Sequence, residues 1–322
     1  MQNAKIGVIV LNWNGKEDTS ACIVSLQKSS FPMEIVIVDN GSTDDSVEHF
    51  RSVFPSCTLI ETHANLGFAG GNNVGIAHCL EKGHDFVLLL NNDTVVAPDF
   101  IEAFVEGFKA HPQAGILGSK IYLMEEPKRF DHFGGFWRRG RVDFEYVGYR
   151  MIDDGKSWEV PKEIDYVCGA SMMVRREVFE KIGQLDERFF LYCEETDFCF
   201  RARRNGFAVM TCPKAKVWHK VSASFQGNKS KAAYFQWRNR LLWIERNFRG
   251  LERMGYFICL FGIHLPALYL NRILSQVKIG LKILTGRDPS HSREIARRRT
   301  AAISGFYDYI ARRFGEGTSR KF

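Results

Sequence analysis

The chain has 322 residues, of which 45% are hydrophobic and 25% are charged. This balance is typical of soluble globular proteins and excludes a disordered chain, which would have too few apolar residues to form a core. The length allows one large domain with an extension. The net charge is +7, yet residues 251–322 carry 13 Lys and Arg against 5 Asp and Glu, so the first 250 residues are almost neutral. The basic character therefore belongs to the C-terminal part.

The cysteines and the N-terminus indicate the compartment. The eight cysteines form no CxxC pair and have no metal-finger spacing. The first residues, MQNAKIGVIVLNWNG, lack the charged, apolar and cleavage regions of a signal peptide. We therefore expect reduced thiols in a cytoplasmic protein.

Four segments rich in Val, Ile and Leu near the N-terminus are typical of buried strands, and a helical stretch follows each of them. The strands are expected at 5–12, 33–40, 57–63 and 85–93, and the helices at 17–29, 44–53, 72–82 and 98–110. Apolar strands that alternate with helices of about 10 to 13 residues form βαβ units whose sheet is covered on both faces. The sequence therefore predicts an open, mostly parallel α/β sheet.

Polar residues and glycines follow the end of each of these strands. The segments are NWNG (12–15), DNGSTDDS (39–46), NLGFAGGNN (65–73) and NNDT (91–94). Ligands of open α/β sheets bind beyond the carboxyl ends of the strands. We therefore predict a ligand-binding crevice at this edge of the sheet.

Two of these segments fit either a turn or a nucleotide site. Asp39 opens a cluster typical of turns and helix N-caps, but a carboxylate at a strand end can also accept hydrogen bonds from a base or a ribose. Gly67, Gly70 and Gly71 precede a helix that we expect to start near Asn72. They allow close approach of a phosphate or simply a flexible turn, and their spacing is neither a P-loop nor GxGxxG.

The segment NNDT ends an apolar strand and predicts a metal site. Asn91 and Asp93 place oxygen ligands on alternate positions, which suits Mg²⁺ or Mn²⁺ holding a diphosphate. The alternative is a strand-ending turn in which Thr94 and Pro98 lead into the next helix. His219 follows a later apolar segment; it completes the metal shell or contacts the diphosphate if it faces Asp93, and otherwise is an ordinary surface or core histidine.

Periodicity weakens at 111–165, where we expect loops and short antiparallel strands over the crevice. The pattern then predicts a strand leading into a helix at 166–183, and a helix that ends at Gly206. Three carboxylates in EETD (194–197) stand before or within the first turn of this second helix. An acid there can pair with an arginine four residues later, and two adjacent acids at a crevice can include a general base whose pKa is raised by its neighbour and by burial.

Residues after about 228 are expected to form helices with basic faces. The apolar run at 255–270 matches a buried helix in length, falls short of the roughly 20 residues that span a bilayer and contains His264 and Pro266, so a transmembrane helix is an alternative that we do not favour. The basic and apolar mixtures at 276–287 and 293–314 suit either an anionic membrane surface or a solvated helix face.

Six motifs occur along the chain in the order VIVLNWNG, IVIVDNGSTDDS, NLGFAGGNN, LLLNNDT, a long segment from CGASMMV to RARRNG, and VWH. Together they resemble glycosyltransferase family 2, particularly its bacterial rhamnosyltransferase-like branch, over about residues 4 to 245. The resemblance implies a GT-A fold, a Rossmann-like open mixed sheet flanked by helices, here with a basic helical C-terminal extension. The expected domains are a catalytic domain at 1–227, with a nucleotide-binding half at 1–95 and an acceptor-binding half at 96–227, and a helical, membrane-associating region at 228–322.

The resemblance also implies roles for individual residues. Asp93 matches the last acid of the family's DxD metal motif, whose first position is Asn91 here. Many relatives have Glu-Asp where this chain has Glu194 and Glu195; the second acid is usually the base, and the choice between the two stays open here. The predicted catalytic residues are Glu195, Glu194 and Asp197; the metal ligands are Asp93, His219 and Asn91; and the nucleotide-binding residues are Asn12, Asn14, Asp39, Asn40, Gly41, Asn65, Gly70, Asn72 and Asn92.

From the resemblance we expect a metal-dependent, inverting sugar transferase of cell-surface polysaccharide synthesis. Glu195 would deprotonate an acceptor hydroxyl, which attacks C1 opposite the leaving nucleoside diphosphate while Mg²⁺ or Mn²⁺ neutralises charge. The donor would be dTDP- or UDP-linked, with rhamnose favoured, and the acceptor a glycan or a lipid-linked saccharide at the inner face of the plasma membrane. Self-association is an open option, and the segment 233–248 fits a helix closing over the active site or simply core packing.

Two other classes of function are alternatives. A nucleotidyltransferase would favour a Gly-, Lys- and Arg-rich stretch after the first strand, and NWNGKED is a poor one. A non-catalytic sugar-nucleotide-binding protein or membrane-associated scaffold has no chemical need for the carboxylates at 93, 194, 195 and 197. No aromatic platform or groove-reading helix in the sequence supports nucleic acid as a partner.

Overall fold

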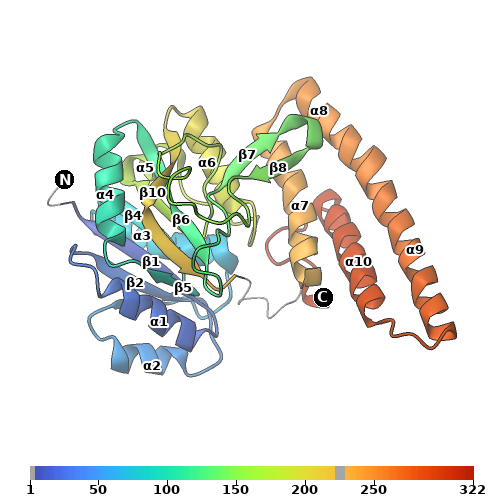
Figure 1. The fold of residues 1–322 in the computed structure, drawn as a ribbon, viewed down its shortest axis with the longest axis horizontal. Helices are drawn as coiled ribbons and strands as arrows, with labels where there is room; N and C mark the ends of the chain where they lie inside the picture. Colours follow the sequence, from blue (N-terminus) through green and yellow to red (C-terminus); the bar gives the residue numbers. More distant parts are fainter. Residues whose placement is uncertain (1–3, 222–228) are drawn as a thin grey trace. The chain divides into compact units, whose positions relative to one another are not determined.

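The structure, a computed structural model, describes residues 4–221 and 229–322 and contains two compact units (Figure 1). One unit comprises the described residues up to Asp186 together with those from Glu195 to the end of the last strand. The other comprises Glu187–Glu194 and the C-terminal helices. All the predicted site residues except Glu194 therefore belong to the first unit.

An eight-stranded mixed sheet forms the centre of the first unit, in the order β3-β2-β1-β4-β9-β6-β10-β5. Its strands are β1 (Ile6–Asn12), β2 (Glu34–Asp39), β3 (Thr58–Glu61), β4 (Phe86–Asn91), β5 (Thr94–Val96), β6 (Ala114–Leu123), β9 (Ser171–Arg175) and β10 (Ala208–His219). Strands β1 to β4 pair in parallel, as do β6 and β10, whereas β9 runs antiparallel to β4 and β6, and β5 antiparallel to β10. The predicted open α/β sheet is confirmed.

Helices cover both faces of this sheet. They are α1 (Lys16–Leu26), α2 (Ser46–Val53), α3 (Gly67–Glu81), α4 (Phe100–Ala110), α5 (Arg176–Ile182) and α6 (Glu194–Arg204). Val8 and Val10 of β1 belong to a buried cluster with side chains of α1, α2 and α4, and Ile9 belongs to a second cluster with side chains of α3, α5 and α6. Because successive strand residues face opposite sides, the continuous apolar strands require this double cover.

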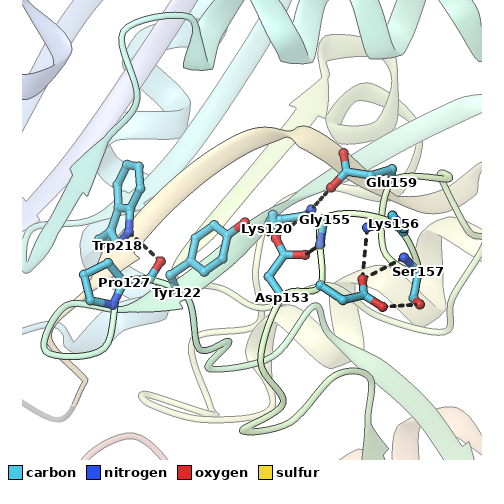
Figure 2. Close-up of polar contacts among 10 residues, drawn as sticks. Lys120, Tyr122, Pro127, Asp153, Gly155, Lys156, Ser157, Glu159 and Trp218 are labelled. Carbon is cyan, nitrogen blue, oxygen red and sulfur yellow. Dashed lines mark hydrogen bonds and ion pairs between the residues drawn. The ribbon is translucent and has the colours of Figure 1, made fainter.

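Strand β6 lies where loops and short strands were expected, and its ten residues, AGILGSKIYL, are all buried. The prediction is wrong there because Gly, Ser and Lys interrupt the apolar run that would have indicated a buried strand. Lys120 is accommodated because carboxylate oxygens of Asp153 and Glu159 lie 3.1 and 2.5 Å from its ammonium group, as Figure 2 shows. The expected short antiparallel strands are confirmed by β7 (Gly135–Arg138) and β8 (Asp143–Tyr146).

The second unit is helical. Its helices are α7 (Lys229–Asn247), α8 (Gly250–Cys259), α9 (Leu265–Leu284) and α10 (Ser290–Ile310). Helix α10 packs against α7, where the rings of Trp237 and Phe306 lie 5.3 Å apart, and against α9, where Nε of Arg272 donates to the hydroxyl of Thr300 at 3.0 Å. A π-helical turn at Leu260–His264 joins α8 to α9.

The joined segment Gly250–Leu284 corrects the expectation for the apolar run at 255–270. It is 35 residues long, is apolar enough to cross a membrane by length and composition, and has only 6% of its most apolar window buried. The helix is therefore longer than the apolar run and is not a buried core helix. Length and composition alone are weak evidence for a membrane role.

Candidate active site

Asp39, the last residue of β2, is a fixed hydrogen-bond acceptor at the edge of the sheet. Its side chain is buried, Oδ1 accepts from Nδ2 of Asn12 at 2.9 Å, and Oδ2 accepts from the backbone N–H of Ser42 at 3.0 Å. The hydroxyl of Thr19 donates to Oδ1 of Asn12 at 2.7 Å and accepts from Nδ2 of Asn92 at 2.9 Å. Each carboxylate oxygen can accept a second hydrogen bond, so Asp39 can orient the donors of a ligand.

Four other predicted nucleotide-binding residues shape the loops beside Asp39. The side-chain oxygens of Asn14, Asn40 and Asn65 accept backbone N–H bonds from loop residues at 2.7, 3.0 and 2.8 Å. Gly41 has a φ of 73°, and a Cβ there would lie 2.6 Å from the backbone of Ala64. The structure thus brings these residues to one end of the sheet, where part of their polar chemistry holds the loops in place.

Gly70 and Asn72 lie within α3, which starts at Gly67 rather than near Asn72. Both are buried, and Nδ2 of Asn72 donates to a carbonyl of the preceding helical turn at 2.9 Å. The neighbouring glycine allows the helix to approach β1 closely, since a Cβ at Gly71 would lie 2.5 Å from the side chain of Leu11. The predicted start is wrong because glycines disfavour a helix, and close packing on the strand outweighs that preference here.

Asp93 and His219 form a buried pair just after the end of β4. The antiparallel pairing of β5 with β10 sets Thr94 opposite His219. As a result, Nε2 of His219 lies 3.1 Å from Oδ1 of Asp93, and Nδ2 of Asn91 lies 3.4 Å from the same nitrogen. The three residues predicted as metal ligands are therefore together, and the histidine does face Asp93.

Asp131 is a second carboxylate beside this histidine. Its Oδ2 lies 3.6 Å from Nδ1 of His219. Burial disfavours the charged imidazole, but the bonds with Asp131 and Asp93 outweigh burial and raise the pKa of His219 to about 9. Sequence reasoning missed Asp131 because it lies in the segment with weak periodicity, and no spacing connects it with a histidine so much later in the chain.

The side-chain ligands at this end of β4 fit a divalent cation that takes most of its other ligands from water and from the substrate. In the described ranges 4–221 and 229–322, no group of three or more His, Cys, Asp and Glu side chains is arranged to hold a metal. Asp93, His219 and Asn91 nevertheless offer a carboxylate, an imidazole and an amide oxygen. Mg²⁺ and Mn²⁺ accept such ligands, and Mg²⁺ in particular uses one or two carboxylates and completes its shell with water and substrate phosphates.

Glu195 is the accessible acid of the first turn of α6. It is half-buried, whereas Glu194 and Asp197 are only 3% and 0% exposed. A Cβ at Gly169 would lie 3.4 Å from Cβ and Cγ of Glu195, so the glycine leaves room beside this side chain. No sequence pattern indicates that role of Gly169, because nothing in its spacing relates it to α6.

Glu195 lies near the end of β4, because it stands beside Gly169 and the next residue, Ala170, accepts the backbone N–H of Asn91, the last residue of β4, at 2.9 Å. Cys168 is half-buried, and desolvation of its thiol together with the negative charges of Asp131, Glu195 and Asp93 raises its pKa well above the ordinary value. The predicted base and the predicted metal ligand belong to the same neighbourhood.

Asp197 forms the ion pair that its spacing allowed. Its Oδ2 accepts from Nε of Arg201 at 2.8 Å, and that guanidinium also donates to the carbonyls of Ile182 and Gln184 at 2.6 Å. The aspartate thus ties the start of α6 to the loop after α5. This arrangement supports the expected orienting role more than proton transfer.

Comparison with known proteins gives the family. A model of glycosyl transferase family 2 matches residues 7–183, which is more than half of the chain. The chain is 28% identical over 258 residues to a low-salt glycan biosynthesis hexosyltransferase of Haloferax volcanii, covering 78% of this chain and 79% of that protein. It is 27% identical over 213 residues to an N-acetylglucosaminyl-diphospho-decaprenol L-rhamnosyltransferase of Mycobacterium tuberculosis, covering 58% of this chain and 66% of that protein.

Solved structures agree on the fold. A mannosyltransferase from Pyrobaculum calidifontis, solved with GDP-Man and Mn²⁺, superposes with a TM-score of 0.57 at 15% identity over 96% of this chain and 88% of that chain. At this identity the likeness shows the fold, which is the GT-A fold of these glycosyltransferases. The family match includes the strand ends that carry Asp39 and Asp93. The chain belongs to glycosyl transferase family 2 and is a glycosyltransferase.

Proposed function

We propose that the protein transfers a sugar from a dTDP- or UDP-linked donor to a hydroxyl of a glycan or lipid-linked saccharide, with inversion at the anomeric carbon. The observation that carries this proposal is that Glu195 lies beside Gly169, while the next residue, Ala170, accepts the backbone N–H of Asn91 at 2.9 Å, two residues before Asp93. A residue suited to the donor's diphosphate and one suited to the acceptor's proton therefore belong to one site. The rhamnosyltransferase activity of the Mycobacterium tuberculosis relative favours rhamnose as the sugar.

The nucleotide is assigned to the half at 1–95 and the acceptor to the half at 96–227. Asp39 supports the first assignment because it is buried and held by two protein donors, which fixes the direction of its remaining acceptor sites. Those sites suit the N–H of a base or the hydroxyls of a ribose. The half-exposed Glu195 supports the second assignment.

Glu195 is the general base in this proposal. Its carboxylate takes the proton of the acceptor hydroxyl while that oxygen bonds to C1 of the sugar. The bond between C1 and the diphosphate oxygen breaks on the opposite face, so the configuration at C1 inverts. Asp197 and Glu194 are buried and orient the first turn of α6.

Asp93, His219 and Asn91 would hold Mg²⁺ or Mn²⁺ at the end of β4. When bound, the ion would neutralise charge that develops on the departing diphosphate. The pairing of Asp93 with His219 balances the carboxylate in its absence. Support also comes from the Mn²⁺ in the structure of the Pyrobaculum calidifontis enzyme.

An anionic membrane surface is the proposed location of the acceptor. One face of α9 is apolar and more than half exposed, at Leu270, Ile273, Val277, Leu281 and Leu284. Residues 253–287 contain five Lys and Arg and no Asp or Glu. A helix with an exposed apolar stripe and basic flanks binds the interface of anionic bilayers.

The π-helical turn keeps this stripe continuous with α8. Ile258 and Leu270 are both exposed and twelve residues apart, which in an α-helix leaves them about 120° apart around the axis. A π-helical turn absorbs roughly one extra residue and so brings the two side chains back to nearly the same face. The other face of α9 contacts α10, where Arg272 donates a hydrogen bond to Thr300. The segment therefore fits a helix lying in the interface better than one that spans the bilayer.

Calorimetric titration with UDP, dTDP, GDP and CDP tests the donor assignment. Each nucleotide is titrated with Mn²⁺ present and again with a chelator. Binding of one pyrimidine diphosphate that depends on Mn²⁺ is expected, and dTDP would indicate rhamnose. Binding of a purine diphosphate alone, or equal binding without metal, would contradict the donor or the metal assignment.

Co-sedimentation with lipid vesicles tests the membrane assignment separately. Binding to vesicles containing phosphatidylglycerol is expected, with much weaker binding to pure phosphatidylcholine. Replacing Lys278 and Lys282 by Ala should weaken the binding about fivefold for each lysine. Equal binding of both vesicle types would contradict the electrostatic part of the assignment.

A further inference from the structure

A strained turn leads directly into the first turn of α6. Phe190, Tyr192 and Cys193 have φ values of 65°, 69° and 72°. These values fall in the left-handed region, which bulky L-residues rarely adopt. Such conformations persist only where the surrounding structure holds them, and they are concentrated at functional sites. The turn ends immediately before Glu194 and Glu195.

Asn239 of α7 holds the backbone of this turn. Its side chain is fully buried, and its Nδ2 lies 2.8, 2.7 and 2.8 Å from the carbonyl oxygens of Phe189, Leu191 and Tyr192. The carbonyl of Phe189 also accepts the backbone N–H of Leu191 at 2.7 Å, within the turn itself. One amide group therefore gathers three carbonyls that a strained backbone turns toward it.

Arg238, the residue before Asn239, holds the beginning of the same turn. It is also fully buried, and its Nη2 donates to the carbonyls of Phe189 at 2.8 Å and Arg188 at 3.2 Å. Its Nε donates to Oδ1 of Asn239 at 2.9 Å and fixes the orientation of that amide. Its Nη1 binds the carbonyl of Gly315 at 2.5 Å.

The chemistry of this arginine argues for a positional role. Burying a guanidinium disfavours the folded state, and an apolar side chain of similar size would fill the same space with less penalty. Instead the planar fork of Arg238 reaches several backbone carbonyls at once. The aromatic rings of Tyr234 and Phe235 lie 5.4 and 5.0 Å from its guanidinium carbon, and Phe235 also stacks on Phe190 at 5.5 Å.

We propose that Arg238 and Asn239 are positioning residues for Glu195. By fixing the backbone between Arg188 and Tyr192, they set where α6 begins and how its first carboxylates are presented. The inference rests on the proposed function, in which Glu195 takes the proton of the acceptor. A base must stay within hydrogen-bond reach of that proton, and a displacement of about 1 Å can lower the rate about 100-fold.

Three variants of the full-length protein separate positioning from stability. Asn239→Ala removes the amide that binds three carbonyls, and Arg238→Lys keeps the charge but loses the fork. Leu241→Ala is the matched control, because Leu241 is as buried as Asn239 but lies two residues after it in α7, about 160° away around the helix axis, and its side chain cannot bind the carbonyls of the turn. For each variant, kcat, the donor KM and the melting temperature are measured, with amide hydrogen exchange in the peptide 187–197.

Asn239→Ala should lower kcat at least tenfold, leave the donor KM within about twofold, and raise exchange in 187–197 at least tenfold. Arg238→Lys should change the same quantities in the same direction by less. Leu241→Ala should lower the melting temperature comparably and keep kcat within about threefold. Should Asn239→Ala fail to fold, Arg238→Lys against Leu241→Ala makes the same comparison.

Two patterns of kcat would overturn the inference, and a third contrary result concerns hydrogen exchange alone. One is a loss of kcat in Leu241→Ala equal to that in the other variants at equal loss of stability. The other is faster exchange in 187–197 with unchanged kcat, which would leave the turn a purely structural feature. Failure of the proposed function looks different, because the unaltered protein would then transfer no sugar from any donor. Even in that case, unchanged hydrogen exchange in 187–197 of the variants would show that Arg238 and Asn239 do not hold the turn.

Discussion

The ends of β2 and β4 carry acidic residues at the same edge of the sheet, but the protein stabilises them in different ways. Asp39 is held by neutral donors, the amide of Asn12 and a backbone N–H. Asp93 is balanced by an ionisable partner, His219. Neutral hydrogen bonds fix a geometry before any ligand arrives, whereas a cation can displace the proton that His219 carries and then bind the same carboxylate. The end of β2 is therefore suited to orienting a nucleotide, and the end of β4 is suited to binding a cation.

Of the substitutions that test this comparison, Glu195→Gln should give the largest loss of sugar transfer. The amide cannot accept the acceptor's proton, so transfer should fall by about two orders of magnitude or more. Donor binding should stay nearly unchanged, because neither strand end is altered. Transfer rate and calorimetric donor affinity are the measurements, with Glu180→Gln, at an exposed position of α5, as the control. Near-normal transfer would shift the base to Glu194 or Asp197.

Asp93→Ala should come next. Loss of this carboxylate should reduce nucleotide affinity at least tenfold in Mn²⁺. In a chelator the affinity should stay unchanged, because the substitution removes a metal ligand and no group that contacts the nucleotide directly. Titration of the pyrimidine diphosphate that binds the unaltered protein measures both values, and Asp99→Ala, an exposed aspartate before α4, is the control. An equal loss with and without metal would mean that Asp93, like Asp39, orients the nucleotide directly.

Asp39→Asn tests the opposite half of the comparison. The substitution turns one acceptor oxygen into an NH₂ group that faces existing donors, which disfavours the fold by about 1–3 kcal/mol. Nucleotide affinity should fall about tenfold both in Mn²⁺ and in chelator. Denaturant unfolding and titration are the two measurements, and Asp44→Asn in the same loop is the exposed, isosteric control. A loss seen only with Mn²⁺ would erase the distinction between the two strand ends.

The two strand ends also differ in how much of them the sequence predicts. Asn12 and Asp39 end apolar strands and Asp93 comes two residues after one, so local pattern places them at the edge of a parallel sheet. Asp131 lies in the segment of weak periodicity and Gly169 in the strand predicted within 166–183, and both reach the site only through tertiary contacts. The same limit explains β6, whose buried Lys120 depends on carboxylates that the chain supplies much later.

Gly71→Ala should have the smallest functional effect and decides which role the glycines of α3 play. The added Cβ would lie 2.5 Å from the side chain of Leu11, so α3 must move away from β1. Overpacking of this kind lowers the free energy of unfolding by about 1–3 kcal/mol. If the glycines serve packing, the folded variant should bind nucleotide within about twofold of the unaltered protein. A tenfold loss of affinity at the same stability would instead place the backbone of this segment against the donor's phosphates, and the fixed nucleotide site would then extend from β2 into α3.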